Sequence, residues 1–182
     1  MIENINITGH EVSAALHALM NDSVYGYNGV FNYGEKLACE IVSNNEIRIK
    51  DGLLLNQGRF MSIKTSTYES LAIENGVSGV NRTDLIVAHF ETDGITETHE
   101  LRIIKGAAGG SEPTHTTGNT FTGARVNELP LYAVKLEGLN IVSVEQKFTL
   151  IDSLKNKGNI LYGTTTPSNV EGTDGDIYIM IE

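Results

Sequence analysis

The sequence predicts a mainly β protein, an antiparallel β-sandwich or barrel-like domain with one short N-terminal helix and a small C-terminal β module. Roughly ten short segments rich in β-branched and aromatic residues are separated by turn residues. Only one stretch has the helical period of apolar side chains. We therefore expect a helical segment over residues 1–24, a β domain over 25–152 and a C-terminal β module over 153–182.

The helical pattern lies in residues 8–20. Thr8 and Glu11 have the spacing of a capping box, which predicts the start of the helix, and the polar residues 21–23 are expected to end it. A helix of about three turns is unstable alone in water, so we expect it to dock on the β domain. Its predicted buried face consists of Val12, Ala15, Leu16, Leu19 and Met20.

Strands are predicted from residue 36 onward, after two turn-rich stretches at 25–29 and 32–34. Asn44-Asn45 and Asp51-Gly52 are expected to form turns. Strict alternation of polar and β-branched residues over 46–50 is typical of a strand with one face in solvent. The predicted strands of this first half are 36–42, 46–50, 53–55, 59–64 and 70–74.

A continuous apolar run over 85–90 predicts a central strand covered on both faces, and residues 98–105 are its expected antiparallel partner. Residues 106–128 have no periodicity and predict a long exposed loop. Further strands are expected at 129–136, 140–144 and 147–151. A turn at 173–175 and a terminal strand at 176–181 follow.

Composition and charge exclude several classes of protein. Lys and Arg number 13 against 23 Asp and Glu, so the net charge is -10 and the pI about 4.9. An acidic chain without a basic cluster disfavours nucleic acid as a partner. No apolar stretch approaches the ~20 residues of a membrane span, and the N-terminus lacks the pattern of a secretion signal. A single cysteine excludes an intramolecular disulfide, so we expect a protein synthesised and folded in the cytoplasm.

No catalytic, metal or cofactor site is assigned from the sequence. His10 and His17 are two helical turns apart, too far for one metal ion. His89 and His99 are interpreted as facing each other across a hairpin in a packing contact, and His115 as meeting solvent in a Thr-rich loop. Cys39 is expected to pack as a small hydrophobic residue. A calcium site would need acidic side chains at the spacing of an EF-hand loop, and the acidic residues near the C-terminus do not have it. They are interpreted as part of a tight turn, and they are Glu171, Asp174 and Asp176.

Two stretches resemble known proteins. The first runs through residues 37–52 and 56–59 and continues at 74–76, 81–88, 129–132 and 136–140. It resembles a family of tail and baseplate structural proteins from phages and prophages of Gram-positive bacteria. The second, residues 163–169 with 172–179, is similar to a short module that recurs in phage tail fibres. Together they extend from about residue 8 to the end of the chain.

The resemblance implies a structural protein of the tail tip, baseplate or tail fibre, located in the virion or in a phage-tail-like particle. Its partners would be other tail proteins, and its role would be to support host attachment without catalysis and without a cofactor. Isoleucine side chains alternate with Tyr178 and Met180 in the terminal strand, so both of its faces are apolar. Because such a strand favours burial against another subunit, we expect a homo-oligomer, a homotrimer by analogy with tail fibres. The expected contact residues are Ile177, Tyr178, Ile179 and Ile181.

A carbohydrate-binding module is the alternative interpretation. Aromatic residues in a Gly- and Asn-rich segment can form a stacking platform for a cell-wall glycan, although the same residues can close one end of the β core. An enzyme acting on glycans would need two close carboxylates in a cleft, and no pattern indicates them. The candidate glycan contacts are Tyr25, Tyr27, Phe31 and Tyr33.

Overall fold

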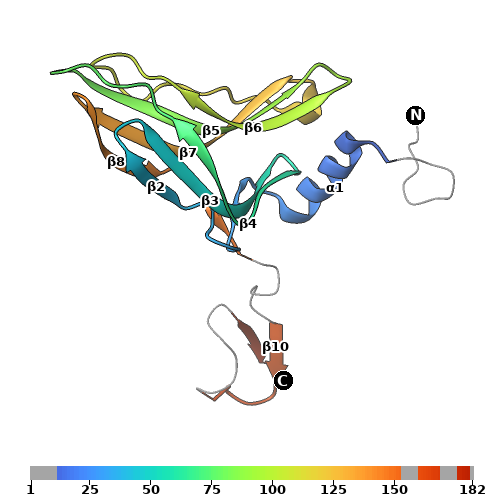
Figure 1. Cartoon of the computed structure of the whole chain (residues 1–182). Coiled ribbons are helices and arrows are strands. Elements are labelled where there is room, and N and C mark those ends of the chain that lie inside the picture. The colour runs from blue at the N-terminus through green and yellow to red at the C-terminus, as the bar shows by residue number, and fades with distance from the viewer. Residues whose placement is uncertain (1–11, 153–159, 169–175, 181–182) are drawn as a thin grey trace. The chain divides into compact units, whose positions relative to one another are not determined.

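The computed structural model describes residues 12–152, 160–168 and 176–180 (Figure 1). The protein is mainly β, with a helix near the N-terminus and two large antiparallel sheets, so the predicted fold class is confirmed. The chain divides into two compact units, Met1–Leu150 and Ile151–Glu182. The border of the units falls within the short strand β9, close to the expected start of the C-terminal module.

The first sheet is built around the long strand β3 (Glu46–Asn56). β4 (Arg59–Ala72) pairs along one edge of β3 over its whole length. β2 (Cys39–Ser43) and β1 (Gly29–Phe31) follow one another along the other edge. β9 (Leu150–Ile151) lies beyond β1 in the strand order β2-β3-β1-β9.

The second sheet is a four-stranded antiparallel sheet in the order β6-β5-β7-β8. Its strands are β5 (Asn81–Thr92), β6 (Glu97–Ile104), β7 (Val126–Glu137) and β8 (Asn140–Gln146). The predicted central strand and its hairpin partner are therefore confirmed as β5 and β6. A single turn of 3-10 helix, η1 (Thr120–Thr122), precedes β7.

The two sheets pack face to face as a β-sandwich, which Figure 1 shows as two layers. One cluster of buried side chains draws on both layers, with Val30, Ile47 and Leu54 from the first sheet. Ile86 and Leu131 come from the second sheet. Since apolar burial is the main favourable contribution to folding, this shared interior holds the two sheets together.

The first sheet differs from the prediction in the continuity of its strands. Asp51 and Gly52 are not a turn, because both are buried inside β3 where its register with β4 shifts by a bulge. The backbone of Leu37 lies so close to Gly52 that a Cβ there would be 2.6 Å from the Leu37 amide nitrogen. The two predicted strands at 59–64 and 70–74 are one bulged strand, with Ser66 at a φ of 62°. β1 was not predicted.

The helix α1 (Ala14–Tyr25) begins and ends later than predicted. Ser13 is its N-cap, and the Ser13 hydroxyl accepts a hydrogen bond from the Leu16 amide at 3.2 Å. Thr8 and Glu11, the predicted capping box, lie outside the described residues. Residues 21–23 continue the helix instead of ending it, and Gly26 in the left-handed region closes it.

The buried face of α1 was also predicted wrongly. Ala18 is buried, whereas Leu19 and Met20 are 46% and 36% exposed. The helix docks on the turn between β3 and β4, where the Asn21 side chain donates to the Gly58 carbonyl oxygen at 2.9 Å. Ala18 on the helix and Gly58 in the turn are both small, so the two backbones can approach closely. This close approach decides which face of the helix is covered.

The loop over residues 106–123 is long and aperiodic, as expected, but it is anchored to the second sheet. The Gly109 amide donates to the Asn81 carbonyl oxygen at one end of the sheet. The Thr116 amide donates to Glu128 Oε2, and the Glu128 amide to the Thr116 carbonyl oxygen, at the other end. The loop therefore runs along the outer face of β5 and β7, where a second apolar cluster lies buried, formed by Leu85, Val87 and Ala133.

The second unit contains β10 (Ile160–Gly163) and β11 (Ile177–Met180), which pair in parallel. β11 corresponds to the predicted terminal strand, and the predicted turn at 173–175 lies outside the described residues. In the part of the chain that the structure describes, no helix has the length and apolar character needed to cross a membrane.

Candidate functional site

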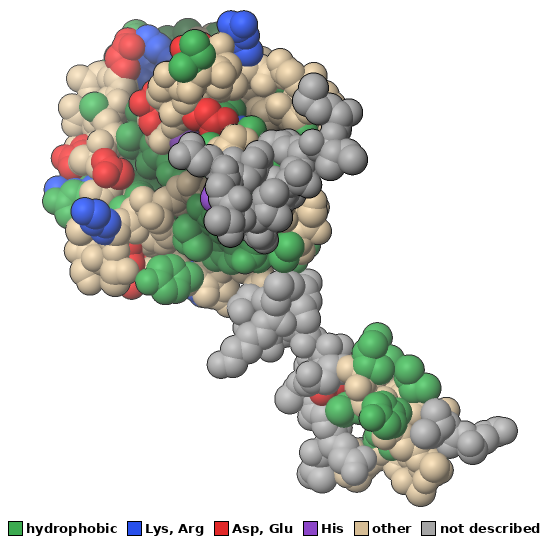
Figure 2. Space-filling model, turned by 90° about the vertical axis from the view of Figure 1, so that its right-hand side faces the viewer, with side chains coloured by type: hydrophobic (Ala, Val, Ile, Leu, Met, Phe, Trp, Pro, Cys, Tyr) green, Lys and Arg blue, Asp and Glu red, His purple; other side chains and the backbone are tan. Residues whose placement is uncertain are grey.

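The C-terminal unit exposes four apolar side chains on one side of its two-stranded sheet. Parallel pairing aligns Ile160 with Ile177 and Tyr162 with Ile179, so these four side chains point to the same side of the two-stranded sheet. Their exposed fractions are 64%, 59%, 73% and 48%, in the order named. We call this set the C-terminal apolar face, and Figure 2 shows hydrophobic side chains gathered on this unit.

Tyr178 lies on the other side of the same sheet. It is half-buried, and its hydroxyl donates to the Thr165 carbonyl oxygen at 3.1 Å. A Cβ on Gly163 would lie 2.1 Å from the Tyr178 hydroxyl oxygen, so the Tyr178 ring covers Gly163. Of the predicted contact residues, the structure therefore exposes Ile177 and Ile179 on one side of the sheet and places Tyr178 on the opposite side, while Ile181 lies outside the described residues.

The four candidate glycan contacts are placed in different surroundings. Tyr25 and Phe31 meet edge to face, with ring centroids 5.4 Å apart, and both contact Phe60, a residue the sequence reasoning missed. Tyr33 is 57% exposed, and its hydroxyl lies 3.3 Å from the hydroxyl of Thr65. Tyr27 is 44% exposed. Two of the four aromatic residues thus belong to a packed aromatic cluster instead of a stacking platform.

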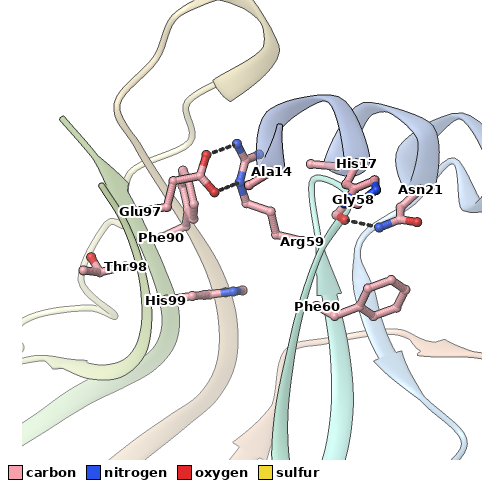
Figure 3. Close-up of a pocket in the computed structure, with 11 residues that line it drawn as sticks. Ala14, His17, Asn21, Gly58, Arg59, Phe60, Phe90, Glu97, Thr98 and His99 are labelled. Atoms are coloured by element: carbon pink, nitrogen blue, oxygen red, sulfur yellow. Dashed lines mark hydrogen bonds and ion pairs between the residues drawn. The ribbon is translucent and has the colours of Figure 1, made fainter. Parts of the chain in front are cut away.

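A pocket of about 320 Å³ opens between α1, the start of β4, and the edge formed by β5 and β6 (Figure 3). We call it the His99 pocket. Residues from four separate stretches of the chain meet here, and they include His17, Asn21, Arg59, Phe60, Phe90 and His99.

Arg59 lines the His99 pocket, and its guanidinium group forms hydrogen bonds with other side chains of the protein. Its Nε and one terminal nitrogen bind the two carboxylate oxygens of Glu97 at 3.0 and 2.6 Å. The other terminal nitrogen donates to the Thr120 hydroxyl at 3.1 Å. The guanidinium carbon lies 4.2 Å from the ring centroid of Phe90. The hydrogen bond from Arg59 holds the pKa of Glu97 below its ordinary value, although burial opposes this.

His99 points from β6 into the pocket (Figure 3) and meets the Phe90 ring edge to face. Both of its ring nitrogens are buried and have no hydrogen-bond partner. Burial lowers the pKa of His99 from 6.5 to about 4, the positive charges of Arg59 and His89 add to this, and Glu97 opposes it. The imidazole is therefore neutral at pH 7.

His89 and His99 do not face each other, contrary to the prediction. In the β5–β6 hairpin, His89 pairs with Glu100 and His99 pairs with Phe90, so the two histidines lie on opposite faces of the sheet. His89 instead contacts two carboxylates, Glu128 at 2.8 Å and Glu91 at 3.3 Å. Side-chain alternation along the strand therefore gives the two histidines separate environments.

The depressed pKa of His99 predicts a loss of stability on acidification. Between pH 6.5 and 4 the unfolded chain binds a proton at this residue and the folded chain does not, so the free energy of unfolding falls as the pH falls. At pH 5 this difference amounts to about 2 kcal/mol. His99→Phe keeps an aromatic ring beside Phe90 but cannot titrate.

Urea denaturation at pH 7 and pH 5 checks this prediction in both proteins. The wild type is expected to lose about 2 kcal/mol more than His99→Phe over this interval, because only the wild type has an imidazole that titrates at this position. Equal losses would contradict the predicted protonation behaviour of His99.

Two further residues singled out from the sequence, Cys39 and His115, lie in the described part of the β domain. Cys39 packs against the core cluster, as predicted, and burial raises the pKa of its thiol to about 12. His115 is half-buried in the anchored loop, and His10, Glu171 and Asp174 lie outside the described residues. Among the residues that are described, no group of three or more His, Cys, Asp or Glu side chains is arranged to hold a metal ion.

No protein-family model matches the chain, and no curated protein matches it. The resemblance to phage tail proteins therefore stays a prediction.

Proposed function

We propose that this chain is a structural component of a phage tail tip, baseplate or tail fibre. It is synthesised in the bacterial cytoplasm, assembles with further copies of itself and with other tail proteins in the virion, and supports attachment to the host cell. The resemblance to tail proteins of the stretches named above, between residues 37 and 140 and between 163 and 179, supports the kind of particle. The C-terminal apolar face carries the proposal of self-assembly.

The physical argument concerns the stability of the C-terminal sheet. Two strands alone are marginally stable in water, and parallel sheets in folded proteins are covered on both faces. β10 and β11 are parallel, and the four side chains of the C-terminal apolar face are each about half or more exposed. Covering such a side chain contributes about 1 kcal/mol or more, so burial of this face favours association.

A second copy of the same chain is the partner that this face fits. The face consists of three isoleucine side chains and one tyrosine side chain and carries no charge, so copies related by rotation present matching apolar surfaces to one another. The number of copies, three, comes from the analogy with tail fibres.

Replacing Ile177 and Ile179 together by lysine is expected to convert the oligomer into a monomer. Two ammonium groups within an apolar interface would lose their hydration and repel their copies across the rotation axis. Size-exclusion chromatography with light scattering, over a wide range of protein concentration, measures the mass of each protein. The wild type is expected at the mass of three chains and the variant at that of one.

Leu139→Lys is the matched control. Leu139 is 55% exposed in the turn between β7 and β8, so this variant adds a lysine without touching the C-terminal apolar face. We expect it to keep the wild-type mass. A wild-type protein that stays monomeric at all concentrations, or a double-lysine variant that keeps the oligomeric mass, would refute assembly through this face.

A further inference from the structure

We propose that the His99 pocket binds a neutral polyhydroxyl molecule, with a single sugar residue as the ligand class that it fits. The observation that carries this is the pair of buried, unpartnered nitrogens on a ring directed into a cavity (Figure 3). This proposal is independent of the assembly role, which rests on the other unit.

The hydrogen-bonding capacity of His99 selects a hydroxyl-bearing ligand. A neutral imidazole has one N–H donor and one acceptor nitrogen, and both are unsatisfied here. A hydroxyl group can both donate and accept, so neighbouring hydroxyls of one sugar ring can satisfy both nitrogens. Leaving a buried donor or acceptor unpaired costs about 1–3 kcal/mol, and a ligand that pairs with both would recover this.

The charges around the pocket exclude an anion. Arg59, the cation that lines it, is already bound to both carboxylate oxygens of Glu97 and to Thr120. The ion pair neutralises the local charge, and the net charge of -10 repels anions from the whole chain. Neither the ion pair nor the net charge lowers the affinity for a neutral ligand.

The walls of the pocket suit one sugar ring. Phe60 lines the pocket and is 42% exposed, so its ring can stack against the C–H face of a sugar. Contacts with Tyr25 and Phe31, at centroid distances of 5.9 Å each, hold the Phe60 ring in place. The volume of about 320 Å³ lies at the lower end of the range of small-molecule pockets, about 300–1,000 Å³.

The polar groups on the opposite wall come from α1. Asn21 donates through its side-chain nitrogen to the Gly58 carbonyl oxygen, which fixes the carboxamide at the edge of the pocket. His17 lies one helical turn earlier on the same wall. Hydrogen-bonding groups on both walls and an aromatic ring in the lining are the features expected for recognition of a sugar.

The test is a titration of the full-length wild-type protein, followed through the imidazole nitrogens by NMR. The probes are glucose, N-acetylglucosamine and glycerol, with inorganic phosphate as the anionic comparison. We expect saturable shifts of the His99 nitrogens with at least one of the two sugars, with a Kd on the order of 1–10 mM, and no saturable shift with phosphate. Water as the only occupant predicts no saturable shift with any probe, and this result would overturn the proposal.

Two variants locate the binding. His99→Phe is expected to weaken sugar affinity at least tenfold, as measured by ligand-observed saturation transfer, whereas His115→Phe, in the loop outside the pocket, keeps the wild-type affinity. Phe60→Ala provides a second pocket variant in case His99→Phe does not fold, and it too is expected to weaken binding. Undiminished sugar affinity in a folded pocket variant, or saturable binding of phosphate at His99, would refute the proposed site.

Discussion

Gly58→Ala is expected to detach α1 from the sandwich and to lower the free energy of unfolding by roughly 2–4 kcal/mol. Gly58 has a φ of 72°, in the left-handed region that alanine adopts at a cost. A Cβ at this position would lie 1.7 Å from the Ala18 carbonyl oxygen, and backbone atoms of the helix cannot move aside without breaking the contact. The hydrogen bond from Asn21 to Gly58 would be lost with it.

Gly79→Ala separates the two causes. Gly79 has a φ of 75°, close to that of Gly58, but no atom lies within 4 Å of its would-be Cβ. We expect this control to lose only about 1 kcal/mol. Urea denaturation gives the free energies, and amide hydrogen exchange is expected to show loss of protection in α1 with β5 still protected in Gly58→Ala. Equal effects of the two substitutions would refute close backbone packing at Gly58.

Arg82→Ala is expected to cost about 3–5 kcal/mol, because it leaves a carboxylate buried without its cation. Arg82 and Asp84 are 7% and 1% exposed and are joined by two hydrogen bonds of 2.8 and 3.0 Å. Arg82 also donates to the backbone carbonyl oxygens of Glu74 and Asn75, and Asp84 accepts from the Gly106 amide at 2.9 Å. Arg82 and Asp84 thus join the start of β5 to two connecting segments.

Arg102→Ala is the matched control for this prediction. Arg102 lies on the neighbouring strand β6 and also binds carboxylates, Glu100 at 2.6 Å and Glu91 at 3.5 Å, but its side chain is 43% exposed. Exposed ion pairs contribute between about 0 and 1 kcal/mol, so little change is expected. Urea denaturation of both variants measures the contrast, and a loss below about 1 kcal/mol for Arg82→Ala would contradict the role of the buried pair.

Several residues on which the predicted resemblance to tail proteins rests have structural roles in this fold. In addition to Arg82 and Asp84, Gly76 approaches Gly138 so closely that a Cβ would lie 1.8 Å from the Gly138 carbonyl oxygen. Asn56 accepts a hydrogen bond from Asn127 at 2.6 Å in the buried interior. These positions hold strands and turns together, so the resemblance concerns architecture before it concerns any binding surface.

The β class and the central strand follow from the amino-acid sequence without any knowledge of tertiary contacts. The apolar run over 85–90 predicts burial on both faces, and β5 is buried there because the first sheet covers its inner face and the anchored loop crosses its outer face. The alternation in 46–50 predicts half of β3. Local side-chain order carries this information, because a strand alternates its side chains whatever its partners are.

The docking of α1, the bulges through which β3 and β4 continue, and the surroundings of His99 depend on contacts between distant parts of the chain. The apolar period of the helix predicts a face containing Leu19, but the approach of Ala18 to Gly58 covers a different face. Arg59 and Glu97 are 38 residues apart and meet only when the β3–β4 turn lies against β6. Contacts of this kind depend on backbone approach between distant segments, and no local pattern in the sequence encodes them.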